Sequence, residues 1–132
     1  MRLDGAVLFV RDLRRSQDFY EQLLELETQV SAPEMVLLAG AQGDHLLLRA
    51  LPGTNVVART NGVRRLLWTA SDAEDLRRAT RVLESSGPVV TESHDGLEVV
   101  EGLDPDRFQI ALIYPGVPGV GAVMLPNSLY AY

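Results

Sequence analysis

Cysteine and lysine are both missing from the 132 residues of this chain, and every basic side chain other than two histidines is arginine. The absence of cysteine excludes disulfides, thiolate metal ligands and cysteine nucleophiles together. The absence of lysine excludes Schiff-base chemistry on a lysine amine. Composition alone therefore excludes catalytic and metal sites that depend on cysteine or lysine.

The chain also has no long apolar run and no excess of positive charge. No apolar run approaches the roughly 20 residues that a transmembrane helix needs, and the N-terminus lacks the pattern of a signal peptide. The formal net charge of −6 argues against a general nucleic-acid-binding protein, which needs a basic face. Apolar residues make up 46% and charged residues 23%, as in an ordinary soluble domain. We expect a cytoplasmic protein with no membrane or nucleic-acid partner.

Hydrophobic periodicity predicts the same order of elements in both halves of the chain. Asp12 and Asp72 each follow a strand and are good helix caps. The expected elements of the first half are a strand at 5–10, a helix at 13–26 and strands at 28–33, 35–40 and 45–51. Those of the second half are a strand at 63–70, a helix at 73–87 and strands at 88–93, 96–102 and 107–114. This repeat predicts an α+β fold of two βαβββ modules that share one core.

The division of the chain follows from this repeat. We predict a single domain, 1–132, with a first module at 3–52, a linker at 53–62, a second module at 63–115 and a tail at 116–132. Gly and Pro in the tail are typical of a mobile chain end. Its Val, Met, Leu and Tyr residues instead favour docking on an apolar surface.

Two stretches resemble a known family. VLFVRDLRRSQDFYEQLLELE, at 7–27, is similar to the first strand and helix of the vicinal oxygen chelate superfamily of glyoxalases, bleomycin resistance proteins and dioxygenases, whose signature is V-x-D-L-x-x-S-x-x-F-Y-x-x-x-L. LDPDRFQIALIYP, at 103–115, is similar to its closing strand, usually D-P-D-G-N-x-I-E-L, although DRF replaces D-G-N here. With the repeat, the resemblance covers residues 3–115. It implies an open, cup-shaped mixed sheet with helices on the convex face, ligands in the concave cleft, and a homodimer.

The resemblance also assigns the places of a metal site. In the metal-dependent members, His, Gln or Glu side chains from the strands hold one divalent ion. The corresponding places here are Gly5, Leu47 or Leu48, Arg65 and Ala111. None of these is a good donor, and arginine is a permanent cation. The resemblance therefore implies a metal-free member without a cofactor, which binds a drug or metabolite.

The histidines and several acidic residues are the remaining polar candidates for a site. His45 opens a strand and is expected to face the cleft, whereas His94, in SHDG, is predicted to be a solvated turn residue. A metal held by both histidines would need them in one cleft together with a carboxylate. Glu98 and Glu101 could face either side of their strand. The acid pairs at 74–75 and 104–106 are interpreted as a helix cap and a turn.

Strand alternation predicts which side chains line the cup. We expect Trp68 to pack in the core instead. The predicted ligand-binding residues are Val7, Phe9, His45, Leu47, Arg49, Arg65, Leu67, Gln109, Ala111 and Ile113. Arg65 either holds a carboxylate, phenolate or quinone oxygen of a ligand or forms a surface ion pair.

Three functions follow from these expectations. The first is a metal-independent, dimeric protein that sequesters a bulky small molecule, such as an aromatic or polycyclic antibiotic. The second is a metal-dependent lyase, epimerase, thiol transferase or dioxygenase of the same superfamily with displaced ligands. The third is a non-catalytic interaction or regulatory module. Metal content separates the first function from the second, and a cleft filled by its own side chains would favour the third.

Overall fold

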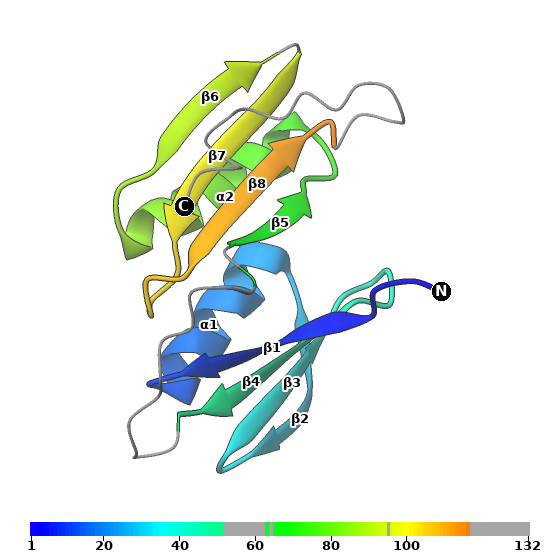
Figure 1. Ribbon diagram of the computed structural model, residues 1–132, viewed down its shortest axis with the longest axis vertical. Helices are drawn as coiled ribbons and strands as arrows, with labels where there is room; N and C mark the ends of the chain where they lie inside the picture. Colours follow the sequence, from blue (N-terminus) through cyan, green and yellow to red (C-terminus); the bar gives the residue numbers. More distant parts are fainter. Residues whose placement is uncertain (52–62, 64, 95, 117–132) are drawn as a thin grey trace. The chain divides into compact units, whose positions relative to one another are not determined.

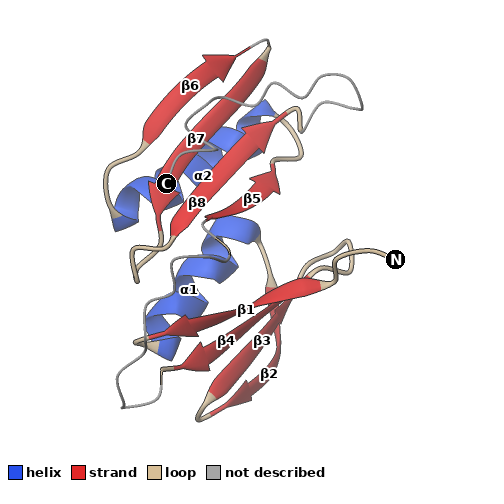
Figure 2. Cartoon of the chain, viewed as in Figure 1, coloured by secondary structure: helices blue, strands red, loops and turns tan. Residues whose placement is uncertain are grey.

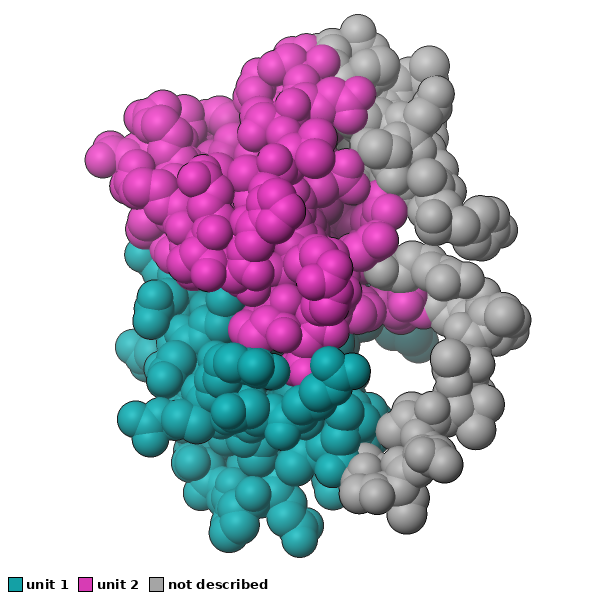
Figure 3. Space-filling model, turned by 90° about the vertical axis from the view of Figure 1, so that its left-hand side faces the viewer, with its two compact units in different colours: residues 1–61 teal, residues 62–132 magenta. Residues whose placement is uncertain are grey.

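The computed structural model describes residues 1–51, 63, 65–94 and 96–116. The chain divides into two compact units, Met1–Asn61 and Gly62–Tyr132, which Figure 3 shows in different colours. The predicted linker at 53–62 and nearly all of the predicted tail lie outside the described residues. Among the described residues, no helix is long and apolar enough to cross a membrane.

The first unit is a βαβββ module (Figure 1). Its elements are β1 (Gly5–Val10), α1 (Leu13–Leu24), β2 (Glu27–Ala32), β3 (Met35–Ala39) and β4 (His45–Ala50). The strands form one mixed sheet in the order β1-β4-β3-β2, in which β1 runs parallel to β4 and the other neighbours are antiparallel. The sheet brings the two ends of the module together, because its first and last strands are neighbours.

Helix α1 covers one face of this sheet. Asp12 caps the helix by accepting a hydrogen bond from the backbone N–H of Arg15 at 3.0 Å. Glu25 ends it in the left-handed conformation, with φ 52°, so the predicted extension to residue 26 is wrong although Leu26 is buried. The helix buries Ser16, Phe19, Tyr20 and Leu23, and the sheet buries Val36, Leu38, Leu46 and Leu48. This apolar interface is the core of the unit.

The second unit repeats the topology, as Figure 2 shows by element type. Its elements are β5 (Arg65–Thr69), α2 (Ala73–Ser86), β6 (Val90–His94), β7 (Leu97–Leu103) and β8 (Gln109–Tyr114). The strand order β5-β8-β7-β6, with β5 parallel to β8, matches that of the first unit. The predicted α+β class with two βαβββ modules is therefore confirmed.

Helix α2 covers one face of the second sheet. Asp72 caps it by accepting the N–H of Asp75 at 2.7 Å, and Leu76, Ala79 and Leu83 are buried. A Cβ at Gly102 would lie 2.3 Å from Cδ2 of Leu83, so glycine allows this close approach of helix and strand.

One prediction in this unit is wrong. His94 is the last residue of β6 and pairs with Leu97, so it belongs to a strand and not to the turn.

Candidate functional site

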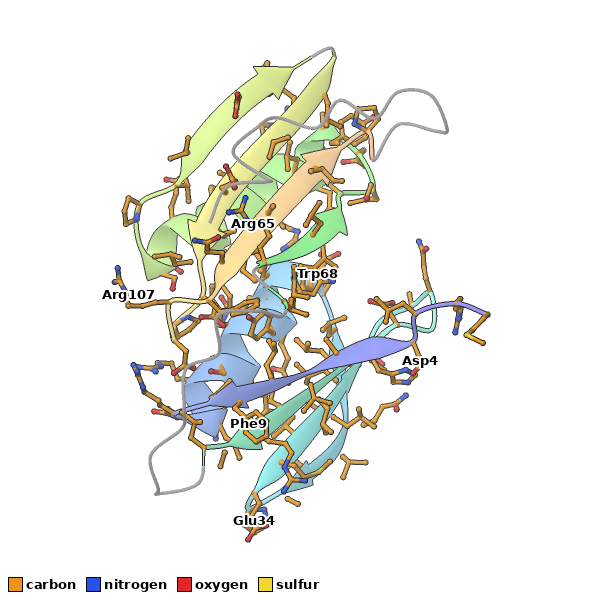
Figure 4. The ribbon with its side chains drawn as sticks, in the orientation of Figure 1. Asp4, Phe9, Glu34, Arg65, Trp68 and Arg107 are labelled. Atoms are coloured by element: carbon orange, nitrogen blue, oxygen red, sulfur yellow. The ribbon has the colours of Figure 1, made fainter. Side chains whose placement is uncertain are left out.

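The face of the first sheet that points away from α1 holds all the predicted ligand-binding residues of this unit. Strand register places the residues of this face in three rows. The rows are Gly5, His45 and Ala39; Val7, Leu47 and Leu37; and Phe9, Arg49 and Met35. Val7 and Phe9 are 55% and 56% exposed. We call these nine residues the first-sheet face; Figure 4 labels Phe9 on it.

The register also settles which leucine of β4 shares the face with Gly5. Leu47 pairs with Val7 and lies on the first-sheet face, whereas Leu48 pairs with Leu8 and is fully buried on the α1 side. The resemblance assigned one metal place to Leu47 or Leu48. Of these two residues, only Leu47 lies on the same face as Gly5.

A histidine–aspartate pair stands at one end of the first-sheet face. Nδ1 of His45 lies 2.9 Å from Oδ2 of Asp4, the residue immediately before β1. Arg2 lies 3.6 Å from the other carboxylate oxygen of Asp4. The His45 side chain is 33% exposed, so this imidazole is both fixed by a partner and accessible.

The second sheet carries the remaining predicted residues on its face away from α2. Arg65 pairs with Gln109, Leu67 with Ala111, and Thr69 with Ile113. On the other side of β8, Glu101 pairs with Ala111 and Val99 with Ile113. The side chains of Ala111 and Ile113 are buried, as are those of Leu97 and Val99, whereas Leu67 and Gln109 are exposed. Closing-strand residues predicted to line a cup are thus largely shielded.

Arg65 forms the main polar contact of this second face. Its guanidinium donates to Oε1 of Glu101 at 2.9 Å and to Oε1 of Gln109 at 2.7 Å. The side chains of Arg65 and Glu101 are only 9% and 23% exposed. The alternative of a surface ion pair is therefore corrected: Arg65 is ion-paired, but the pair is mostly withdrawn from water.

Sequence reasoning left Glu101 undecided, and the structure gives it a definite place. The ambiguity arose because Val99 and Val100 are consecutive apolar residues and both are buried, so the alternation along β7 does not reveal which face is polar. The available signal was charge alone: a largely buried Arg65 needs a carboxylate partner, and Glu101 supplies it from β7, one strand beyond the neighbouring β8.

A family model identifies the chain. The model of the Glyoxalase/Bleomycin resistance protein/Dioxygenase superfamily matches residues 2–112. The chain belongs to this superfamily. The resemblance found in residues 7–27 and 103–115 is thereby confirmed, and the two βαβββ units are those that the superfamily resemblance implied.

Solved structures of the same fold agree. One is a glyoxalase/bleomycin resistance protein/dioxygenase domain from Frankia sp. EAN1pec, with a TM-score of 0.72, 17% identity, and coverage of 86% of this chain and 96% of that one. Another is lactoylglutathione lyase from Agrobacterium tumefaciens, with a TM-score of 0.64, 19% identity, and coverage of 85% and 92%. The oxidase ChaP-H2 has a TM-score of 0.69, 12% identity, and coverage of 94% and 98%. No curated protein matches the chain. At these identities the likeness shows the fold alone.

The side chains at the places that the resemblance assigns to metal ligands do not fit a divalent ion. Gly5, Leu47 and Ala111 offer no donor atom, and the guanidinium of Arg65 cannot act as a ligand. Within the described part of the chain, no group of three or more His, Asp or Glu residues could hold a metal. Glu101, which pairs with Ala111 in the sheet, holds the guanidinium of Arg65 at 2.9 Å.

Proposed function

We propose that this protein is a metal-independent small-molecule-binding member of the superfamily, which sequesters a bulky aromatic or polycyclic ligand such as an antibiotic. The observation that supports this most is the Arg65–Glu101 pair. At a place where metal-dependent members have a ligand, this chain has a fixed cation that is already bound to a carboxylate at 2.9 Å. A ligand would then be held by shape, apolar contact and hydrogen bonds.

The first-sheet face supplies the apolar contact that this function needs. Phe9 and Val7 are more than half exposed and stand beside Leu47 and Leu37 in the sheet. Covering the exposed part of each of the two side chains contributes about 1 kcal/mol. An aromatic ligand against Phe9 adds about 0.5–1.5 kcal/mol from ring geometry. We further propose that the protein acts in the cytoplasm as a homodimer.

A catalytic function is the second candidate, because similar folds include a lyase and an oxidase by name. It requires a metal held by residues other than those that the resemblance assigned. An interaction or regulatory module is the third. The three candidates make different predictions for metal content and ligand binding, so one set of measurements separates them.

The experiment is metal analysis of untagged protein by plasma mass spectrometry, followed by thermal unfolding with divalent ions, bleomycin and anthraquinone-2-carboxylate. We expect less than about 0.1 metal per chain, no shift with metals, and a raised melting temperature with at least one of the two organic compounds. Phe9→Ala should reduce that shift, whereas Leu3→Ala, an exposed apolar residue before β1, should not. Stoichiometric metal would establish the enzyme alternative, and absence of any organic ligand effect would favour the interaction module.

A further inference from the structure

The pair of Asp4 and His45 has no role in the proposed function so far. Nδ1 of His45 and Oδ2 of Asp4 are 2.9 Å apart, although the two residues are 41 positions apart in the chain. The two residues are also joined through the backbone, since the N–H of His45 donates a hydrogen bond to the carbonyl of Asp4 at 2.9 Å. Backbone and side chain thus hold the two residues together at the start of β1 and β4.

This contact determines which nitrogen of the imidazole is available. An ionised carboxylate only accepts hydrogen bonds, so the Nδ1 that bonds to Asp4 carries the proton. In the neutral ring, Nε2 then has the lone pair and is the proton acceptor. The neighbours of His45 across the sheet are Gly5 and Ala39, which have no bulky side chain to cover the ring.

We propose that the Asp4–His45 pair accepts a proton from an acidic hydroxyl of the bound ligand, so that the protein selects hydroxylated aromatic compounds and holds them as oxyanions. The ligand O–H bond breaks and an Nε2–H bond forms, so the oxyanion stays hydrogen-bonded to the imidazolium. Asp4 is a positioning residue, which holds Nδ1–H and stabilises the positive charge. This inference rests on the proposed function, because it names the ligand class of the same face.

The rest of the first-sheet face suits such a ligand. Next to His45 comes the apolar row of Val7, Leu47 and Leu37, and then the row that contains Phe9 and the exposed Arg49. His45 and Arg49 are four residues apart on β4, which corresponds to about 13 Å. A planar polycycle with a phenol at one end and an anionic group at the other spans such a strip, since Arg49 supplies the complementary charge.

The charged residues placed around His45 by contact, strand register and sequence are three carboxylates and one guanidinium. Asp4 contacts the ring directly, and Arg2 contacts Asp4 from the other side at 3.6 Å. Glu27 on β2 pairs with Ala39 in the same row, and Asp44 precedes His45 in the chain. Asp4 is the carboxylate in direct contact with the ring, so a proton taken up at Nε2 from the ligand would leave the imidazolium hydrogen-bonded to it.

The test is absorption spectroscopy with two probes, 2-hydroxyanthraquinone and anthraquinone-2-carboxylate. The first absorbs at longer wavelength when its hydroxyl is ionised, and the second has no hydroxyl. On binding at a pH where the free hydroxyl is still protonated, we expect the first probe to show the band of its anion. His45→Gln, which cannot be protonated, should abolish the band and weaken binding of the first probe by about ten- to a hundredfold. Binding of the second probe should change less than about twofold.

Asp4 is tested by the pH at which the bound hydroxyl is half ionised. Asp4→Asn should move this midpoint to higher pH, and Asp4→Glu should restore part of the shift. Glu34→Gln makes the same change of charge in the β2–β3 turn, where its carbonyl contacts Ala50 at the opposite end of β4 from His45 (Figure 4). It should leave the midpoint unchanged. All the substituted residues except His45 are exposed, and thermal unfolding of each variant checks its fold.

The outcomes separate this inference from the proposed function. Binding of both probes without the anion band, or an anion band that survives His45→Gln, would overturn the proton-accepting role and leave the binding function intact. Failure of both probes to bind would overturn the binding function for this ligand class and the inference with it. An anion band that depends on His45, with a midpoint that depends on Asp4 and not on Glu34, would establish the inference.

Discussion

The guanidinium of Arg65 on β5 reaches across β8 to the carboxylate of Glu101 on β7, with 2.9 Å between Nη1 and Oε1. The strand that it crosses contains Gln109, which accepts a second hydrogen bond from Arg65, and Ala111, which pairs with Glu101. The small side chain of Ala111 belongs to this arrangement, since a glutamate there would stand directly beside Glu101. Ala111, the place that the resemblance assigns to the closing-strand metal ligand, therefore lies beside an internal ion pair.

Breaking this pair on one side should destabilise the protein strongly. Arg65→Met leaves the carboxylate of Glu101 with only 23% exposure and without its cation, so we expect a loss of about 2–3 kcal/mol in the free energy of unfolding. The double variant Arg65→Met/Glu101→Met should recover most of that loss, because no charge is then left uncompensated. Urea denaturation of both single variants and the double variant measures the coupling energy. A coupling energy below about 0.5 kcal/mol would show that the pair is effectively solvated.

The turn before β8 contains a residue in a conformation that suits glycine. Arg107 has φ 68°, in the left-handed region, at the position where the superfamily turn usually has glycine (labelled in Figure 4). Asp104 fixes this turn by accepting the N–H groups of Asp106 and Phe108, each at 2.8 Å. The left-handed conformation costs a non-glycine residue about 1–2 kcal/mol of folding free energy. Introducing glycine opposes this gain by about 0.4–1 kcal/mol, because glycine makes the unfolded chain more flexible. Arg107→Gly should therefore stabilise the protein by about 0.5–1 kcal/mol.

A matched substitution makes this prediction specific. Arg77 is exposed in the middle of α2, where Arg77→Gly should destabilise by about 1 kcal/mol. Chemical denaturation of the two variants should give opposite signs. The same sign for both would mean that the left-handed conformation of Arg107 costs little in solution.

The first turn of α2 gives a pH-dependent contribution to stability. The backbone N–H of Ser71 and the guanidinium of Arg78 lower the pKa of the Asp75 carboxyl, against an opposing effect of its partial burial. Because the folded-state pKa is depressed, the stabilisation is complete above the ordinary aspartate value of about 3.9 and is lost as the pH falls through the folded-state pKa. Asp75→Asn should therefore lower the free energy of unfolding by about 1 kcal/mol at pH 7. Solvent screens this partly exposed carboxylate, so the loss is smaller than for a fully buried one.

The check is the difference in unfolding free energy between wild type and Asp75→Asn from pH 7 to pH 2. That difference should be constant at neutral pH and shrink at acidic pH. Glu74→Gln is the control, since Glu74 is exposed in the same helical turn. A difference that grows on acidification would contradict the assigned sign.

Local patterns in the sequence were sufficient for the order of the elements and for the faces of β1 and β4, although not for the face of β7. The strand at 5–10 was predicted with the bounds that the structure has, because its apolar and β-branched run ends at Val10, shortly before the helix cap Asp12. Alternation in this run and in β4 also placed Phe9 and Arg49 on one face. These predictions depend only on the period of a strand, which is a property of neighbouring residues.

Contacts between distant residues were not predictable in the same way. The pairing of Asp4 with His45 depends on the register of β1 against β4, and that of Arg65 with Glu101 depends on two registers across β8. A shift of one residue in either register would send the side chain to the other face. No sequence pattern fixes these registers, since turns and side-chain packing decide them together.

At Gly5, the place that the resemblance assigns to the first metal ligand, the neighbouring backbone leaves no room for a side chain. A Cβ built on Gly5 would lie 2.1 Å from the carbonyl oxygen of His45 in the neighbouring strand. Gly5→His should therefore destabilise the protein by more than about 2 kcal/mol, because β1 or β4 must move, and it should not create zinc affinity. Gly102→Ala is a useful comparison, since its new Cβ would meet the side chains of Leu83 and Val89 instead of backbone, and it should cost about 1–2 kcal/mol. Urea denaturation and zinc titration of Gly5→His measure both effects.

A folded Gly5→His variant of wild-type stability that binds zinc tightly would show that this protein is one substitution away from a metal site. The proposed metal-independent function would then lose its strongest structural support in the first unit.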